Sequence, residues 1–256
     1  MKTIIFLLLY LVPLTSIRVQ LPDAAKIMSN CRELTITGSL SATLHLSITE
    51  KNGSERNRTI SMISRSYPDG LEKRLIRFMA PADVRGTVML VIDKKDEADE
   101  MWIYLPALKR TRRIVTSEKG KSFMSSEFSN ADMTSPTLSD FTYRHLAGSG
   151  SNNQWIIEST PISEDIADEY GFSRRVSYIN SENLQIEKME FYNFDNELFK
   201  TIVIRSNYPL PGGKYLIKDM VADNLISGRK SEIQFSNIDT KVKPGDALFS
   251  VQNLER

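Results

Sequence analysis

A strict alternation of apolar and polar residues near the N-terminal end constrains the fold of this chain more than any other feature. The apolar positions are Leu40, Ala42, Leu44, Leu46 and Ile48, and serine, threonine or histidine fills the positions between them. Successive side chains of a β-strand point to opposite faces of a sheet. The pattern therefore predicts a long strand with one packed face and one wet face.

Similar segments recur about every ten residues, separated by turn signals such as Asn52-Gly53 and Asp195-Asn196. They lie at 58–66, 72–78, 87–93, 101–105, 110–116, 142–146, 154–158, 174–179, 185–192, 198–205, 215–224 and 231–235. Short helices are predicted at 22–31, 129–133, 163–170 and 244–250. This spacing predicts a mainly β (α+β) fold, in which one strongly curved antiparallel sheet carries short helices on its concave side.

The N-terminal residues have the layout of a secretory signal peptide. Met1 and Lys2 give a positive start, residues 3–14 form an apolar run, and the small residues Thr15 and Ser16 follow. The run is short for a membrane span. We therefore expect residues 1–20 to be a signal peptide, cleaved near Ser16 or a few residues later, with an uncleaved anchor as the alternative. Residues 21–256 are then a single domain, soluble in an extracytoplasmic space.

The composition gives little basis for several functional classes. The net charge of +1 offers no reason to expect nucleic-acid binding. The single cysteine, Cys31, excludes an intramolecular disulfide and is expected to be a buried apolar residue. Both histidines lie in alternating strands, and no nucleophile, metal-ligand or phosphate-loop motif occurs. We therefore expect no catalytic residues, no metal and no cofactor, and the chain is not predicted to be an enzyme.

The stretch 101–133 instead carries aromatic, methionine and arginine side chains. Trp102 and Tyr104 share one face of a strand, where they either line a cavity or fill a core. Arg112 either meets lipid head groups or an acidic partner, or belongs to a solvated strand edge. The other candidates for a cavity or a lid are Met89, Phe123, Met124, Phe128 and Met133. Ordinary packing of a short helix is the alternative for those four between 123 and 133.

Around these residues the chain resembles the LolA/LolB-like superfamily, in the branch of outer-membrane lipoprotein-sorting proteins. The matching segments are 78–87 (FMAPADVRGT), 101–108 (MWIYLPAL), 112–114 (RRI), 122–124 (SFM), 127–128 (EF), 132–133 (DM) and 246–255 (DALFSVQNLE). One departure is Ser125, which stands where the branch usually has glycine after the Phe-Met pair. A residue with a Cβ adopts a positive φ less readily than glycine.

The resemblance implies an incomplete β-barrel whose apolar concave face, covered by helices, holds acyl chains. Hiding a chain of about sixteen carbons from water contributes about 10 kcal/mol, at about 0.8 kcal/mol per CH₂. The predicted function is a periplasmic carrier or binder of lipoprotein or lipid acyl chains that moves cargo between the inner and outer membranes. Its expected partners are an inner-membrane transporter and an outer-membrane acceptor, and it is expected to be a monomer.

Two alternatives stay open. One is a periplasmic sensor or scaffold on the same fold, which binds lipidated or misfolded protein without transporting it. The other is an integral outer-membrane barrel. Charge on both faces of the predicted strands 72–78 and 185–192 disfavours the barrel, because a lipid-facing band tolerates charge poorly.

Overall fold

The computed structural model describes residues 21–35, 38–94, 97, 99–135 and 137–255, so the predicted signal peptide lies outside it. A single open antiparallel sheet of thirteen strands dominates this part of the chain. The strands are β1 (Leu40–Thr49), β2 (Glu55–Ser66), β3 (Glu72–Ala80), β4 (Val88–Asp93), β5 (Glu100–Leu105), β6 (Arg110–Ile114), β7 (Phe141–His145), β8 (Gln154–Pro161), β9 (Arg174–Asn180), β10 (Ile186–Tyr192), β11 (Leu198–Pro209), β12 (Tyr215–Asn224) and β13 (Lys230–Asp239). Each predicted strand is present, and the mainly β fold class is confirmed.

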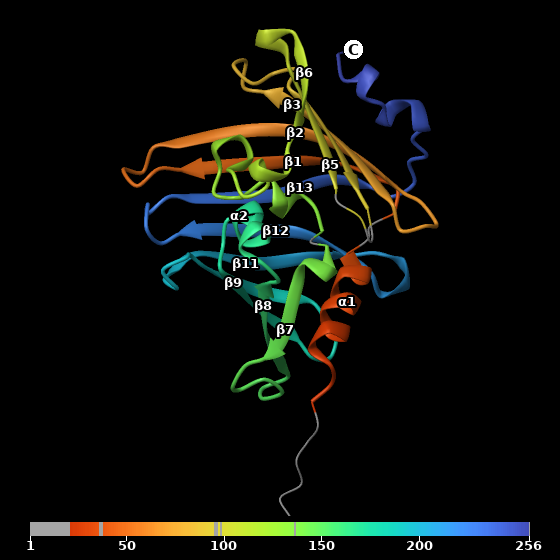
Figure 1. Cartoon of the computed structure of the whole chain (residues 1–256). Coiled ribbons are helices and arrows are strands. Elements are labelled where there is room, and N and C mark those ends of the chain that lie inside the picture. Colours follow the sequence, from red (N-terminus) through yellow and green to blue (C-terminus); the bar gives the residue numbers. More distant parts are fainter. Residues whose placement is uncertain (1–20, 36–37, 95–96, 98, 136, 256) are drawn as a thin grey trace, which may run out of the picture.

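The strand order is β6-β5-β4-β3-β2-β1-β13-β12-β11-β10-β9-β8-β7. Almost every neighbouring pair is therefore a hairpin formed by consecutive strands. The exception is the pairing of β1 with β13, in which Leu44 lies opposite Phe235. This pairing joins two halves of the sheet, and it leaves β6 and β7 at the two free edges (Figure 1).

Because β6 and β7 lie at opposite edges, residues 115–140, here called the crossing segment, must pass from one edge to the other. The segment contains four short 3₁₀ helices: η2 (Thr116–Glu118), η3 (Phe123–Ser125), η4 (Ala131–Met133) and η5 (Leu138–Asp140). It runs in front of the sheet in Figure 1. Phe123 and Phe128 are 1% and 0% exposed, and Phe123 packs on Phe78 with ring centroids 6.1 Å apart. The crossing segment is thus part of the packed interior.

Polar contacts fix the crossing segment to both halves of the sheet. From the first half, Arg58 donates to the Met124 carbonyl and Arg74 donates to the Met133 carbonyl. From the second half, Arg229 pairs with Glu127 at 2.8 Å, and Lys200 pairs with Asp132 at 2.9 Å. These contacts hold the segment over the concave face.

Two α-helices also lie on the concave side in the described part of the chain (Figure 1). Helix α1 (Ala24–Thr35) packs Ile27, Met28 and Cys31 on Ile157 of β8 and Ile179 of β9. Helix α2 (Glu164–Tyr170) contributes Tyr170 to the main apolar cluster, where its ring lies edge-on to Phe141. Cys31 is 1% exposed, as predicted.

The C-terminal short helices occupy the opposite side of the sheet. These helices are η7 (Asp246–Phe249) and η8 (Val251–Asn253). Phe249 of η7 and Leu254, which follows η8, pack on Leu75, Val88 and Leu90. These three strand residues alternate with Ile76, Met89 and Val91, which belong to the main cluster. The helix predicted near 244–250 therefore covers the outer face instead of the concave face. None of the helices in the described residues is both long and apolar enough to cross a membrane.

Candidate functional site

A cavity of about 250 Å³ lies between the concave face, α1 and the crossing segment. The sheet contributes residues from both halves, and the crossing segment and α1 close the other sides. Its apolar lining includes Met28, Cys31, Leu44, Met62, Ile76, Phe128, Ala131, Met133, Leu138, Met189, Ile202, Met220, Ile233 and Phe235. The cavity therefore forms only when segments far apart in the sequence come together.

Five methionines belong to this lining, as many as there are isoleucines. Met28 comes from α1, Met62 from β2, Met133 from the crossing segment, Met189 from β10 and Met220 from β12. Methionine side chains are unbranched and flexible, so they fill irregular spaces and adapt to guests of different shape. A wall of this kind suits an apolar ligand that is bound without a fixed shape.

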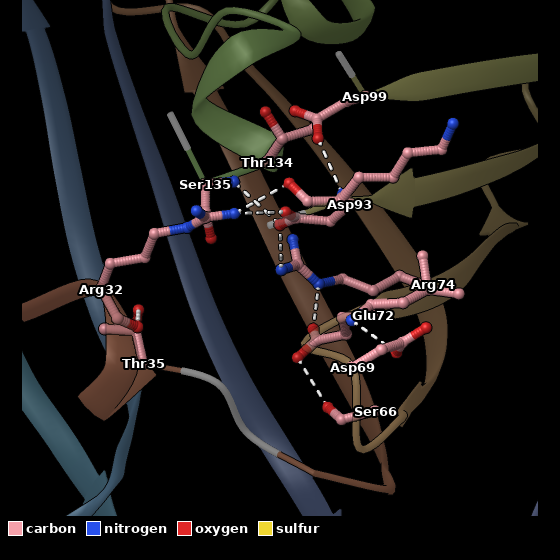
Figure 2. A network of polar contacts seen from close by, with 12 residues as sticks. Arg32, Thr35, Ser66, Asp69, Glu72, Arg74, Asp93, Asp99, Thr134 and Ser135 are labelled. Atoms are coloured by element: carbon pink, nitrogen blue, oxygen red, sulfur yellow. Dashed lines mark hydrogen bonds and ion pairs between the residues drawn. The ribbon is translucent and has the colours of Figure 1, made fainter. Parts of the chain in front are cut away.

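A network of charged groups forms one wall of the cavity (Figure 2). Arg74 of β3 lies between two carboxylates: it pairs with Glu72 and binds Asp93 of β4 at 3.0 Å. Arg32 reaches Asp93 from α1 at 3.4 Å and donates to the Lys94 carbonyl at 3.0 Å. Glu72 and Asp93 are each 3% exposed. Buried charges are costly unless they are paired, and here each is paired.

Two pKa values near this wall are shifted by burial. Burial, with the charge of Asp93 second, raises the pKa of the Asp99 carboxyl to about 6. Burial also raises the pKa of the Cys31 thiol to about 12. Cys31 is therefore a neutral thiol at neutral pH, and it lines the cavity as a small apolar side chain.

The predicted site residues of the crossing segment fall into two groups. Phe128 and Met133 line the cavity. Phe123 is buried in the main cluster and Met124 packs against that cluster, and neither lines the cavity. Met89 of β4 likewise lies in the main cluster, 1% exposed. The structure thus brings these five side chains to one side of the sheet, and their role in lipid binding stays a prediction.

The other three predicted site residues lie outside the cavity lining, and their role in lipid binding also stays a prediction. Trp102 and Tyr104 pack in the outer-face cluster beneath Phe249, because the inward positions of β5 are taken by Met101 and Ile103. Arg112 lies on the edge strand β6, where its exposed side chain pairs with Glu118 at 2.7 Å. None of the three is among the lining residues.

Sequence reasoning missed most of the lining that comes from α1 and the second half of the sheet. Met189, Ile202, Met220 and Ile233 each alternate with outward-facing residues along their strands. That period-two signal was visible in the sequence and could have identified them as inward-facing. It could not have shown that these inward faces border a cavity.

Comparisons with known proteins place the chain in a family. A family model described only as an uncharacterized protein matches residues 70–256. No curated protein matches.

Solved structures match over nearly the whole chain. An outer membrane lipoprotein-sorting protein domain from Vibrio parahaemolyticus has a TM-score of 0.82 and 24% identity, covering 91% of this chain and 98% of its own. A DUF1329 family protein from Desulfovibrio piger has a TM-score of 0.78 and 26% identity, covering 90% of this chain and 97% of its own. A LolA superfamily protein from Nitrosomonas europaea has a TM-score of 0.68 and 17% identity, covering 90% and 98%. The chain therefore belongs to the family of uncharacterized proteins whose model matches residues 70–256, and it has the fold of these outer membrane lipoprotein-sorting, DUF1329 and LolA superfamily structures.

Proposed function

We propose that this protein is a soluble periplasmic carrier that binds the acyl chain of a lipid or lipoprotein in its cavity. It moves this cargo between the inner and outer membranes, receiving it from an inner-membrane transporter and passing it to an outer-membrane acceptor. In this proposal residues 1–20 are the export signal, and residues 21–256 act as one monomeric domain.

The observation that carries the proposal is the methionine-rich cavity beneath the crossing segment and α1. Small-molecule sites enclose about 300–1,000 Å³, so a cavity of about 250 Å³ suits one slim chain better than a bulky ligand. Each methylene removed from water contributes about 0.8 kcal/mol, so an acyl chain gains most of its binding energy from an apolar lining of this kind.

The first test is mass spectrometry of organic extracts from the mature protein, purified from a Gram-negative periplasm without detergent. We expect a lipid or an acylated peptide in stoichiometric amount. Uptake of a fluorescent fatty acid by the delipidated protein then measures binding directly. A folded protein that carries no lipid and takes up no fatty acid would contradict the proposal.

A pair of variants tests whether the cavity is the binding site. Met220→Glu places a charge in the lining, whereas Val203→Glu places the same charge on the neighbouring strand β11, where Val203 is 40% exposed. We expect Met220→Glu to abolish fatty-acid uptake and Val203→Glu to leave it unchanged. Equal effects of the two changes would place the binding site elsewhere.

A transfer assay separates a carrier from a binding module. Loaded protein should give up its lipid to acceptor vesicles faster than the lipid leaves donor vesicles alone. Stable retention of the cargo in the presence of acceptor would support the sensor or scaffold function.

A further inference from the structure

Arg175 is a buried cation in the cavity lining that the charged wall described above does not include. It lies on β9, is 8% exposed, and borders the same space as Met189 and Ile202. Burial lowers its pKa, yet a guanidinium keeps its proton in proteins. Arg175 therefore places a positive charge against an otherwise largely apolar space.

In the described part of the chain, no carboxylate lies within ion-pair distance of Arg175. Its Nε has no hydrogen-bond partner there. The Phe141 ring lies below its guanidinium, with 5.8 Å between Cζ and the ring centroid. Asp132 is the acid that acts on it from a distance, and that carboxylate is already bound by Lys200 at 2.9 Å and by the Ser129 amide at 2.7 Å. By contrast, Arg32 and Arg74 both bind carboxylates.

Two serine hydroxyls in the same condition lie beside Arg175. Ser159 of β8 is opposite Arg175 in the strand register, and Ser177 is two residues further along β9. Alternation puts all three side chains on the concave face. Both serines are 0% exposed, and neither Oγ has a hydrogen-bond partner among the described residues. Of these three side chains, Arg175 lines the cavity and the two serines do not.

A buried Arg175 without a carboxylate partner is costly to the folded protein unless a guest in the cavity balances its charge. A buried charge without a partner destabilises a protein strongly, and buried polar groups are nearly always hydrogen-bonded. A neutral guest such as water would bind the donors but would leave the charge of Arg175 unbalanced. An ionised carboxylate or phosphate both binds the donors and balances the charge, because the planar guanidinium matches either group with two parallel hydrogen bonds.

We propose that Arg175 binds the ionised acid group of a single-chain lipid whose tail lies along the methionines of the cavity. This proposal rests on the proposed function and narrows it. Acyl chains joined by ester or amide bonds carry no ionised acid, so the preferred guest is a free amphiphile with a carboxylate or phosphate head.

The test compares three ligands with the same hydrocarbon chain: palmitate, hexadecyl phosphate and hexadecanol. Their affinities for the delipidated mature protein are measured by calorimetry or by displacement of a fluorescent fatty acid. We expect at least one acid to bind about 10- to 100-fold more tightly than the alcohol, the range of a charge-assisted hydrogen bond. Which of the two acids binds more tightly identifies the head group as carboxylate or phosphate.

Variants then assign the preference to Arg175. In Arg175→Met the acids should lose their advantage over hexadecanol, whereas hexadecanol itself should bind as before. Arg175→Lys should keep part of the advantage, because it keeps the charge without the planar fork. Arg205→Met removes an exposed arginine that pairs with Glu232 at 2.9 Å, and it should leave all three affinities unchanged.

The outcomes separate this proposal from the function on which it rests. If hexadecanol binds the wild-type protein as tightly as both acids, the proposed binding of an acid group by Arg175 is overturned, while acyl-chain binding stands. A preference for acids that persists in Arg175→Met also overturns it. If none of the three ligands binds, the proposed function fails as well. The wild-type comparison needs no variant, so it decides the question even if Arg175→Met does not fold.

Discussion

Replacing Arg74 with methionine should destabilise the protein strongly, because this side chain balances two buried carboxylates. Arg74 pairs with Glu72 and binds Asp93 at 3.0 Å (Figure 2). It also donates to the Met133 carbonyl at 2.6 Å. Although burial opposes its charge, Glu72 and Asp93 hold its pKa above the ordinary value. Methionine has a similar length, so Arg74→Met removes the charge with little change in volume.

The expected loss follows from what each carboxylate keeps. Asp93 retains Arg32 at 3.4 Å and the Ser135 amide at 2.9 Å, whereas among the described residues Glu72 retains the Ser66 hydroxyl alone, at 3.0 Å. Breaking a buried ion pair costs about 3–5 kcal/mol. Since Asp93 keeps partners, the lower end, about 3 kcal/mol, is the expected decrease in the free energy of unfolding at neutral pH.

Urea unfolding followed by circular dichroism measures this loss. With an m-value of about 2–3 kcal/mol per molar urea, the midpoint should fall by about 1 M or slightly more. Arg56→Met is the matched control, because it removes an exposed arginine that pairs with Glu50 at 2.6 Å. An exposed pair contributes less than about 1 kcal/mol. Hydrogen exchange should also rise at residues 131–135, where the Met133 carbonyl loses its donor.

The double variant Arg74→Met/Glu72→Gln tests the cause. If an unbalanced carboxylate produces the loss, neutralising Glu72 should return part of the stability, so the double variant should be more stable than Arg74→Met. A double variant that is less stable, or an Arg74→Met loss no larger than that of Arg56→Met, would refute the reasoning.

Three further changes probe the crossing segment and its surroundings. Burial raises the pKa of Asp99 from 3.8 to about 6, so the folded state binds this proton more tightly and loses that stability as pH rises through about 6. At neutral pH the free energy of unfolding of Asp99→Asn should therefore be about 1–2 kcal/mol higher than that of the wild type. In urea titrations this difference should narrow toward pH 4, and a difference that does not change with pH would contradict the raised pKa of Asp99. Ser125 has φ = 65°, and Ser125→Gly should raise thermal stability by about 0.5–1 kcal/mol because a left-handed backbone strains any residue with a Cβ; a lower melting temperature would contradict this. At Gly120 an added Cβ would meet backbone atoms of Tyr170 at 2.9 Å, so Gly120→Ala should cost about 1–3 kcal/mol in urea unfolding. Gly245→Ala, with open space around it, should stay within about 0.5 kcal/mol of wild type, and equal losses would refute the clash.

The strands were predictable because alternation is a local property of the chain. The run from Leu40 to Ile48 gives the period of β1 directly, and its apolar side packs inward as expected. Turn residues between such runs mark where the chain reverses. The antiparallel sheet, its many hairpins and the burial of Cys31 therefore follow from short stretches of sequence, without knowledge of what packs on them.

The cavity could not be predicted in the same way, because both faces of β4 and β5 are apolar. On β5, Trp102 and Tyr104 form as good an apolar face as Met101 and Ile103. The choice between the faces depends on Phe249 and Leu254, which come from the far end of the chain and cover the outer side. The alternation within the six residues of β5 contains no information about residues near the C-terminus that pack on its outer face.

The sequence by itself determined the strands and their turns, and its resemblance to the LolA/LolB-like superfamily predicted the fold. The tertiary structure decided which residues surround the cavity, through the pairing of β1 with β13 that leaves β6 and β7 at opposite edges. That pairing forces residues 115–140 across the concave face. In the sequence Arg175 looks like an ordinary strand arginine, but in the folded protein it is a buried cation in the cavity lining. Burial and charge balance depend on what other segments place around a side chain, so only the assembled fold assigns them.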